Sequence, residues 1–178
     1  MPSNRIPVTI LTGFLGSGKT TVLNRLLHDP RLTDTAVIVN EFGEIGLDHL
    51  LMESALDQAV LMDNGCLCCS VRGDLADTLS DLLRRVEAGD LPAFSRVVIE
   101  TTGLADPGPI MRTLLTDAAT AERFALAGVV TTVDGINGVE TLSAYPEARA
   151  QAAMADLVLL TKTDRADADP GRVRAALR

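Results

Sequence analysis

Residues 13–21 decide the fold of this chain, and they read Gly13-Phe14-Leu15-Gly16-Ser17-Gly18-Lys19-Thr20-Thr21. An apolar run precedes this stretch at residues 8–11, and a helical pattern follows it at residues 22–27. Strand, glycine-rich loop and helix is the context in which the spacing G-x-x-x-x-G-K-T forms a phosphate-binding loop, or P-loop. The alternative, an ordinary glycine-rich turn, accounts poorly for a pattern that is complete at every fixed position. The stretch therefore predicts a triphosphate site.

Each residue type in the P-loop has a physical task. The glycines allow backbone conformations that a side chain would forbid, and they let the backbone approach a phosphate closely. The backbone N–H groups then converge on the anion at the positive end of the following helix. Lys19 brings a positive charge to the β- and γ-phosphates and is a predicted catalytic residue, while the Thr20 hydroxyl is a predicted Mg²⁺ ligand. The predicted phosphate-binding set is Gly13, Gly16, Ser17, Gly18, Lys19, Thr20 and Thr21.

An acidic residue farther along the chain fits the same site. Residues 97–100 form an apolar strand pattern that ends in Glu100, and Gly103 follows shortly after. In P-loop proteins an acid at this position supports Mg²⁺, often through water. We predict that Glu100 does so as the second catalytic residue, and that the Gly103 N–H approaches the γ-phosphate. The alternative is a strand-end carboxylate that faces solvent.

Residues 161–164 read Thr-Lys-Thr-Asp and are similar to the guanine-reading element N-K-x-D. An Asp164 carboxylate would accept hydrogen bonds from both N–H groups of guanine, for which adenine has no equivalent pair. The Lys162 stem would cover one face of the base. Thr161 stands where Asn is usual. This element predicts GTP as the nucleotide, and an ATP-dependent P-loop enzyme is the alternative.

All three cysteines lie within four residues, Cys66-Leu67-Cys68-Cys69. An odd number packed so closely argues against a disulfide framework, whereas thiolates are soft ligands suited to transition metals such as Zn²⁺. We expect the cysteines to lie in a metal-binding loop; the alternative is a set of small buried apolar side chains. The predicted metal ligands are Cys66, Cys68 and Cys69, with Glu41 and Glu44 as candidate additional ligands or as groups that position Mg²⁺ and water.

Strand and helix patterns alternate along the chain. Near-continuous apolar strands separated by helices predict an α/β fold of the P-loop NTPase type, with a mostly parallel sheet between two helical layers. Ligands of such folds bind at the carboxyl ends of the strands, so the P-loop and residues 40–46, 100–103 and 161–164 should meet at one rim. We expect one domain over residues 1–178, truncated at its C-terminal end. Strands are expected at residues 36–39, 97–100, 127–134 and 157–160, and helices at residues 75–86, 110–115, 147–155 and 170–177.

Composition excludes several other functions. The formal net charge of −8 disfavours binding to a nucleic acid backbone. Aromatic residues make up only 3% of the chain and Trp is absent, which argues against base-stacking platforms. No apolar stretch approaches the length of a membrane span, and the N-terminus lacks a signal peptide pattern. We therefore expect a cytoplasmic protein with no nucleic acid or membrane partner.

Taken together, five elements resemble the CobW-like family of P-loop GTPases and metallochaperones, and within it the YjiA-like members. They are the P-loop, residues 40–44, the cysteine stretch 65–69, residues 100–109 and residues 161–164. The resemblance runs from about residue 8 to residue 164. It implies a GTPase that binds GTP or GDP with Mg²⁺ and handles Zn²⁺ or Co²⁺ for a client metalloprotein or metal-inserting complex. It also implies a smaller C-terminal domain, which these 178 residues do not include.

The predicted function is slow GTP hydrolysis, with the nucleotide state coupled to metal binding at the cysteines. Turnover is expected to be slow because no residue stands out as a catalytic base. One alternative is a zinc buffer or partner-docking switch in which the nucleotide is mainly structural; the other is the ATP-dependent enzyme. The oligomeric state is left open, with a homodimer as one candidate.

Overall fold

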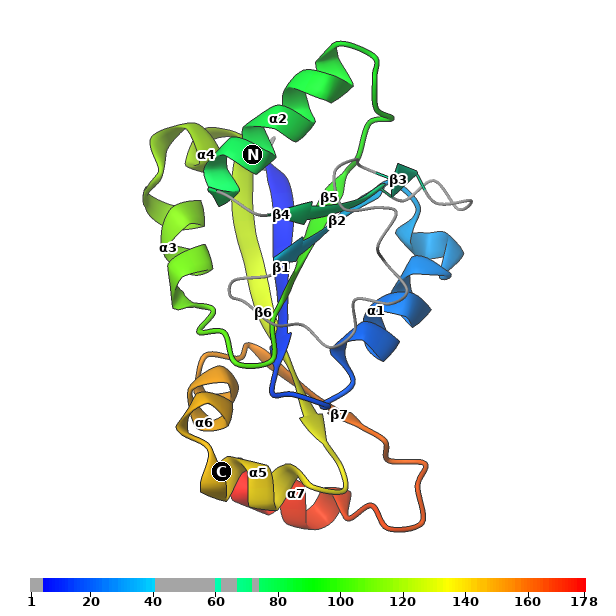
Figure 1. Cartoon of the computed structure of the whole chain (residues 1–178), viewed down its shortest axis with the longest axis vertical. Coiled ribbons are helices and arrows are strands. Elements are labelled where there is room, and N and C mark those ends of the chain that lie inside the picture. Colours follow the sequence, from blue (N-terminus) through cyan, green and yellow to red (C-terminus); the bar gives the residue numbers. More distant parts are fainter. Residues whose placement is uncertain (1–4, 41–59, 62–66, 72–73) are drawn as a thin grey trace.

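The computed structural model describes residues 5–40, 60–61, 67–71 and 74–178 (Figure 1). Strands and helices alternate along most of this length, as the sequence predicted. The strands are β1 (Ile6–Gly13), β2 (Thr35–Asn40), β3 (Val60–Leu61), β4 (Leu67–Val71), β5 (Arg96–Thr101), β6 (Phe124–Asp134) and β7 (Leu157–Thr161). The helices are α1 (Lys19–Leu27), α2 (Leu75–Glu87), α3 (Gly108–Thr116), α4 (Ala118–Arg123), α5 (Gly138–Ala144), α6 (Pro146–Ala153) and α7 (Pro170–Ala176), with a 3₁₀ turn η1 (Pro30–Leu32) after α1.

The strands form one sheet in the order β3-β4-β2-β5-β1-β6-β7. Every neighbouring pair from β4 to β7 is parallel, and only the short β3 runs antiparallel to its neighbour β4. Parallel neighbours need crossover connections, which the helices provide. The predicted mostly parallel α/β sheet is therefore confirmed.

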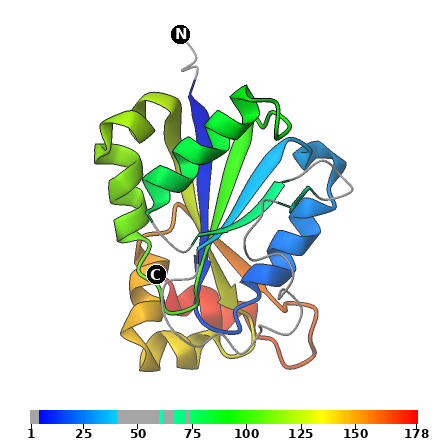
Figure 2. The same ribbon diagram turned by 45° about the horizontal axis from the view of Figure 1, so that its top comes forward.

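Helices cover both faces of the sheet (Figures 1 and 2). α2 and α3 pack on one face, and α5, α6 and α7 gather at the end of that layer where β6 and β7 finish. On the other face α1 packs against β1 and β2. This arrangement is the expected three layers. None of the helices in the described ranges has the length and apolar character needed to cross a membrane.

The core lies between these layers. Ile10 and Ile99, at the centre of the sheet, are fully buried. Each large aliphatic side chain buried in this way contributes about 2 kcal/mol. The larger cluster joins Leu79 and Leu82 of α2 and Ile110 and Leu114 of α3 to the strands, and the smaller one joins Leu23 and Leu27 of α1 to Leu11 and Val37. Burial on both faces thus explains the apolar runs at the centre of the sheet, whereas Leu157 and Leu159 of the edge strand β7 are exposed.

Helix α2 begins at the predicted residue, Leu75, and ends at Glu87, one residue beyond the predicted end. The Asp74 carboxylate accepts a hydrogen bond from the backbone N–H of Ala76 at 2.8 Å, and so caps the first turn. At the other end the helix finishes at Glu87, and Gly89 adopts a left-handed conformation with φ of 81°. Local sequence therefore fixes where this helix begins and ends.

The structure differs from the expectations in three places. Cys68 and Cys69 lie in strand β4, not in a loop, because this segment pairs with both β2 and β3. Short helices α4 and α5 were not predicted, since six or seven residues carry too little periodicity to be recognised. Strand β6 begins at Phe124, three residues earlier than expected, where it pairs with Ile6 of β1. In the two strands, pairing with residues distant in sequence outweighs the local sequence pattern. In the two helices, the segment is too short to show a clear pattern.

Candidate nucleotide site

Four parallel strands end at the same edge of the sheet, and each carries a functional candidate there. The P-loop follows β1, Glu100 lies near the end of β5, and Thr161 ends β7. In register, Gly13 of β1 pairs with Thr132 of β6, and Asp134 pairs with Thr161. The predicted meeting of these motifs at one rim is confirmed for the P-loop, residues 100–103 and Thr161. Residues 41–46, with Glu41 and Glu44, lie outside the described residues.

The start of the P-loop is pressed against β6. Gly13 has a φ of 141°, and a Cβ at this position would lie 2.2 Å from Thr132 Oγ1 and 2.7 Å from Ser17 Oγ. No other residue fits without moving the neighbouring strand, so the glycine in the motif is a packing requirement as well as a conformational one. Later in the loop Gly16 and Gly18 also have positive φ, at 70° and 92°. The predicted conformational role of the glycines thus matches the backbone, and their approach to a phosphate stays a prediction.

Lys19 is held over the loop. Lys19 is only 9% exposed. Its Nζ donates to the carbonyl oxygens of Gly13 at 2.8 Å and Phe14 at 3.3 Å. Burial lowers the pKa of the Lys19 ammonium, and the nearby Glu100 carboxylate opposes that shift. An ammonium has three donors, so one remains for an anion. Lys19 Nζ therefore lies against the P-loop backbone, as its predicted phosphate role requires.

Thr20 and Glu100 form the second polar pair of the site. Thr20 Oγ1 donates to Glu100 Oε1 at 3.0 Å, which joins the first turn of α1 to the end of β5. Glu100 is only 7% exposed, whereas Thr20 and Thr21 are exposed at the start of α1. A hydroxyl and a carboxylate oxygen at this separation are the hard ligands that Mg²⁺ prefers. The residues present therefore fit a magnesium ion between strand and helix.

Thr161 ties the predicted base-reading loop, residues 161–164, to the P-loop. Its hydroxyl donates to the Ser17 carbonyl oxygen at 2.6 Å and lies 3.3 Å from the carbonyl oxygen of Val133. Ser17 is linked in turn to β6, because its hydroxyl lies 2.6 Å from the Thr132 hydroxyl. A donor on a short side chain thus connects the two loops at the position where the guanine-reading element usually has Asn.

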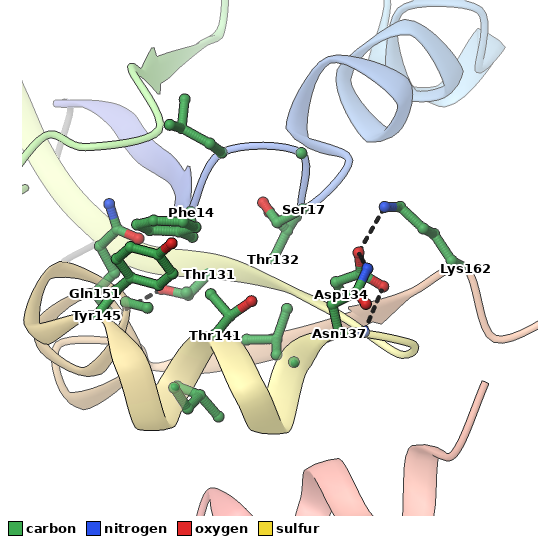
Figure 3. Close-up of a pocket in the computed structure, with 16 residues that line it drawn as sticks. Phe14, Ser17, Thr131, Thr132, Asp134, Asn137, Thr141, Tyr145, Gln151 and Lys162 are labelled. Carbon is green, nitrogen blue, oxygen red and sulfur yellow. Dashed lines mark hydrogen bonds and ion pairs between the residues drawn. The ribbon is translucent and has the colours of Figure 1, made fainter. Parts of the chain in front are cut away.

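Asp134, which the sequence analysis did not single out, lies beside the predicted guanine-reading element, at the end of the site called here the base end (Figure 3). Its Oδ2 accepts from Lys162 Nζ at 2.6 Å, and its Oδ1 accepts from the N–H of Ile136 at 2.8 Å. Burial raises the pKa of the Asp134 carboxyl, but hydrogen bonds from Lys162 and from backbone N–H groups outweigh it, so the pKa is lowered. Lys162 adopts a left-handed φ of 54°, and Asp164 lies exposed in the following turn.

Gly103 lies against the P-loop from the side of β5. It is buried, and a Cβ at this position would lie 2.7 Å from the Leu15 backbone nitrogen and 2.8 Å from Leu15 Cα. Such a close approach requires glycine. The loop after β5 therefore touches the P-loop directly, as its predicted role at the γ-phosphate requires.

A cavity of about 310 Å³ lies behind the P-loop, between β6 and helices α5 and α6 (Figure 3). Phe14 and Tyr145 form one wall, with their ring centroids 4.5 Å apart. Asp134 and Lys162 lie at the opposite end. Gly16 and Ser17 of the predicted phosphate-binding set line this cavity, whereas Lys19, Thr20 and Glu100 do not, so the cavity borders one side of the P-loop. Gln151, which also lines the cavity, was missed because nothing in an alanine-rich helix marks it.

The predicted transition-metal site is only partly within reach of the structure. Cys66 lies outside the described residues, as do both candidate glutamates. In strand β4 the backbone of Cys68 pairs with Val37 and that of Cys69 with Ile38. Among the residues that the structure describes, no three His, Cys, Asp or Glu side chains gather as a metal site. The ligand set therefore stays a prediction.

Several known proteins are similar to this chain in sequence, and a solved structure is similar to it in fold. The zinc chaperone YjiA of Escherichia coli strain K12 is 44% identical over 161 residues, which span 90% of this chain and 50% of that protein. The zinc-regulated GTPase metalloprotein activator 1 of Schizosaccharomyces pombe is 37% identical over 89% of this chain and 39% of its own length. A crystal structure of the zinc-bound YjiA GTPase superimposes with a TM-score of 0.79 at 38% identity, covering 98% of this chain and 54% of that one.

The chain thus spans half or less of the length of these relatives. Residues 7–177 match the family model described as the CobW/HypB/UreG nucleotide-binding domain. That range includes the P-loop, Glu100 and the Thr161–Asp164 turn, which are the elements that meet at the rim of the sheet. The chain therefore belongs to the CobW/HypB/UreG family, through its nucleotide-binding domain.

Proposed function

We propose that this domain binds GTP with Mg²⁺, hydrolyses it to GDP and phosphate, and uses the nucleotide state to control the binding of a transition metal, zinc in the first place. The observation that carries the proposal is the pair Thr20–Glu100 at 3.0 Å beside the buried Lys19. It provides oxygen ligands and a positive charge where a triphosphate on the P-loop needs them. Relatives named zinc chaperone and zinc-regulated GTPase support the choice of nucleotide and metal.

Hydrolysis would use the groups that already surround the P-loop. Water attacks the γ-phosphorus, the bond to the bridging oxygen breaks, and GDP and inorganic phosphate leave. Lys19 Nζ and the loop N–H groups stabilise the negative charge on the phosphate oxygens. Bound Mg²⁺ would neutralise further charge on the β- and γ-phosphates. We identify no general base among the described residues at the P-loop, so we expect slow turnover without a partner.

Selection of guanine would come from the loop after β7. Asp164 is exposed in the turn, so its carboxylate is available to the two N–H donors of a guanine base. Lys162 is steered by Asp134, and Thr161 fixes the loop to Ser17. The base loop and the phosphate loop would therefore move as one unit.

The sheet offers a short route between the nucleotide and the metal. In strand β2, Val39 pairs with Glu100 on one side and with Ser70 on the other, directly after Cys69. Adjacent strands lie about 5 Å apart, so only one strand separates the magnesium-supporting residue from the cysteine strand. We propose that Cys66, Cys68 and Cys69 hold the metal that is delivered as cargo, with Glu41 and Glu44 as candidate further ligands. A client metalloprotein would receive it.

Nucleotide protection and turnover test the first half of this proposal. Melting temperature is measured with Mg²⁺ and GTP, GDP or ATP, and phosphate release is measured with and without Zn²⁺. We expect GTP and GDP to raise the melting temperature more than ATP does, and phosphate to be released from GTP. Equal or greater protection by ATP would favour the ATP-dependent enzyme. Binding without any phosphate release would favour a switch in which the nucleotide is only structural.

A further inference from the structure

Gln151 of α6 holds the loop that follows β5. Its Nε2 donates to the carbonyl oxygens of Gly103 at 3.2 Å and Ala105 at 3.0 Å. The residue is only 1% exposed. If the amide were reversed, its oxygen would face two carbonyl oxygens, so this network fixes the orientation of the amide. One side chain from α6 thus spans two residues of a loop 46 and 48 positions earlier in the chain.

Packing alone does not explain why a glutamine stands at position 151. Gln151 Oε1 is buried and has no hydrogen-bond partner within the described residues. A buried carbonyl without a partner costs stability, so an apolar residue would suit the position better if it served only to fill space. The two bonds from Nε2 are what the glutamine supplies.

Helix α6 is itself anchored to the sheet at this point. Thr131 Oγ1 of β6 donates to the backbone carbonyl of Gln151 at 2.8 Å, and both residues line the cavity behind the P-loop (Figure 3). Gly103 is therefore located from two directions. Leu15 of the P-loop contacts it on one side, and the braced Gln151 holds its carbonyl oxygen on the other.

We propose that Gln151 is a positioning residue for the γ-phosphate, acting by holding Gly103 beside the P-loop. The inference rests on the proposed function, because it assumes that a triphosphate occupies the P-loop. The loop begins directly after Thr101, the last residue of β5, and Gly103 in it touches Leu15, so its N–H groups approach the terminal phosphate. Only the triphosphate has that phosphate. Loss of the two bonds should therefore weaken GTP binding selectively and leave GDP binding almost unchanged.

The substitution Gln151→Met tests this, since it removes both donors and the unpaired carbonyl and keeps the side-chain volume close to that of glutamine. We expect affinity for a non-hydrolysable GTP analogue to fall about tenfold, affinity for GDP to change less than about twofold, and GTP turnover to slow. Arg149→Met is the matched control on the same helix, because Arg149 Nη1 also donates to two carbonyl oxygens, those of Leu142 and Ser143 at the end of α5. It should affect melting temperature without changing the ratio of the two affinities.

The ratio of GTP-analogue affinity to GDP affinity decides whether Gln151 is a positioning residue. Equal weakening of GDP and of the GTP analogue by Gln151→Met, or the same ratio as Arg149→Met, would overturn the positioning role. If Gln151→Met does not fold, Thr131→Val removes the brace behind Gln151 and should shift the ratio in the same direction by a smaller factor; an unchanged ratio would again overturn the role. Failure of the wild-type chain to bind GTP would instead contradict the proposed function itself.

Discussion

Two parts of the P-loop are held in place by different chemistry: the part around Lys19 and Thr20, called here the charged or Lys19 end, and the part around Ser17, called here the neutral or Ser17 end. At the Lys19 end the contacts involve charges: the buried ammonium lies near Glu100, and Thr20 donates to that carboxylate. At the Ser17 end the contacts are neutral, made by the hydroxyls of Thr132 and Thr161. Buried charges are costly unless a partner balances them, whereas buried hydroxyls need only one hydrogen bond each.

This difference indicates a division of labour along one loop. Burial of the charged groups costs stability, and contact with a bound nucleotide would offset that cost. The residues of the charged end should therefore dominate nucleotide binding and turnover. The neutral end should set the shape of the loop and contribute equally to every bound state. Substitutions at the two ends should therefore differ in the size of their effect on nucleotide binding. They should also differ in whether they affect GTP and GDP equally.

The largest effect is expected from Lys19→Met. It removes the positive charge while keeping most of the side-chain stem, and we expect affinity for GTP and for GDP to fall about a hundredfold, since hydrogen bonds to charged groups are strong. Because burial disfavours the Lys19 ammonium, the melting temperature without nucleotide should stay the same or rise. Isothermal calorimetry and thermal unfolding measure the two quantities. A large fall in melting temperature would mean that Lys19 is mainly structural.

Glu100→Gln should separate hydrolysis from binding. The amide keeps the shape of the side chain and loses the negative charge that would support Mg²⁺. We expect turnover to fall about tenfold or more and to need a higher Mg²⁺ concentration, while GDP affinity changes little. Phosphate release measured across a Mg²⁺ titration gives the result. Unchanged Mg²⁺ dependence would place the ion elsewhere.

At the neutral end, Thr161→Val and Thr132→Val each remove one hydroxyl. Each should cost about 1 kcal/mol of the free energy of unfolding, and affinities for GTP and GDP should weaken by the same small factor. Urea unfolding and calorimetry test both statements. A variant that changes the ratio of the two affinities would show that this end also reads the γ-phosphate, and would break the division.

The smallest effect is expected at the base end, from the ion pair of Asp134 and Lys162. Their side chains are 11% and 37% exposed, and partly solvated pairs contribute less than about 1 kcal/mol. The pKa of Asp134 is lowered on folding, so its contribution is complete above its ordinary pKa of about 3.8 and is lost as pH falls through the lower folded value.

Urea unfolding of Asp134→Asn, Lys162→Met and the double variant measures this coupling at pH 6 and at pH 3. The coupling energy should be stabilising at pH 6. It should be smaller at pH 3, because protonation of the Asp134 carboxylate removes the negative charge of the pair. A coupling that grows as the pH falls would contradict the direction of the shift.

Sequence alone predicted the charged end and much of the architecture. The P-loop and Glu100 follow spacings that chemistry dictates, and the apolar runs of the central strands β1, β2 and β5 reflect burial within a parallel sheet. Asp134 was within reach of the same logic, because it closes a predicted strand at the carboxyl edge of the sheet.

Other features depend on contacts that no local pattern encodes. Gln151 donates a hydrogen bond to Gly103, which lies 48 positions earlier in the chain. The alanines around Gln151 form no pattern that would predict this contact. The strand character of Cys68 and Cys69 comes from pairing with β2 and β3. Thr161 lacks the amide expected of its motif, yet its hydroxyl reaches Ser17 because the strand end places it there.

Coupling between nucleotide and metal is the central claim, and a zinc titration tests it most directly. The wild-type chain is titrated with Zn²⁺ while it holds a non-hydrolysable GTP analogue and again while it holds GDP, each beside Cys66→Ala. We predict that the two forms of the wild type differ in zinc affinity by about fivefold or more, and that Cys66→Ala removes the difference. Equal zinc affinity in the two nucleotide forms would contradict the account.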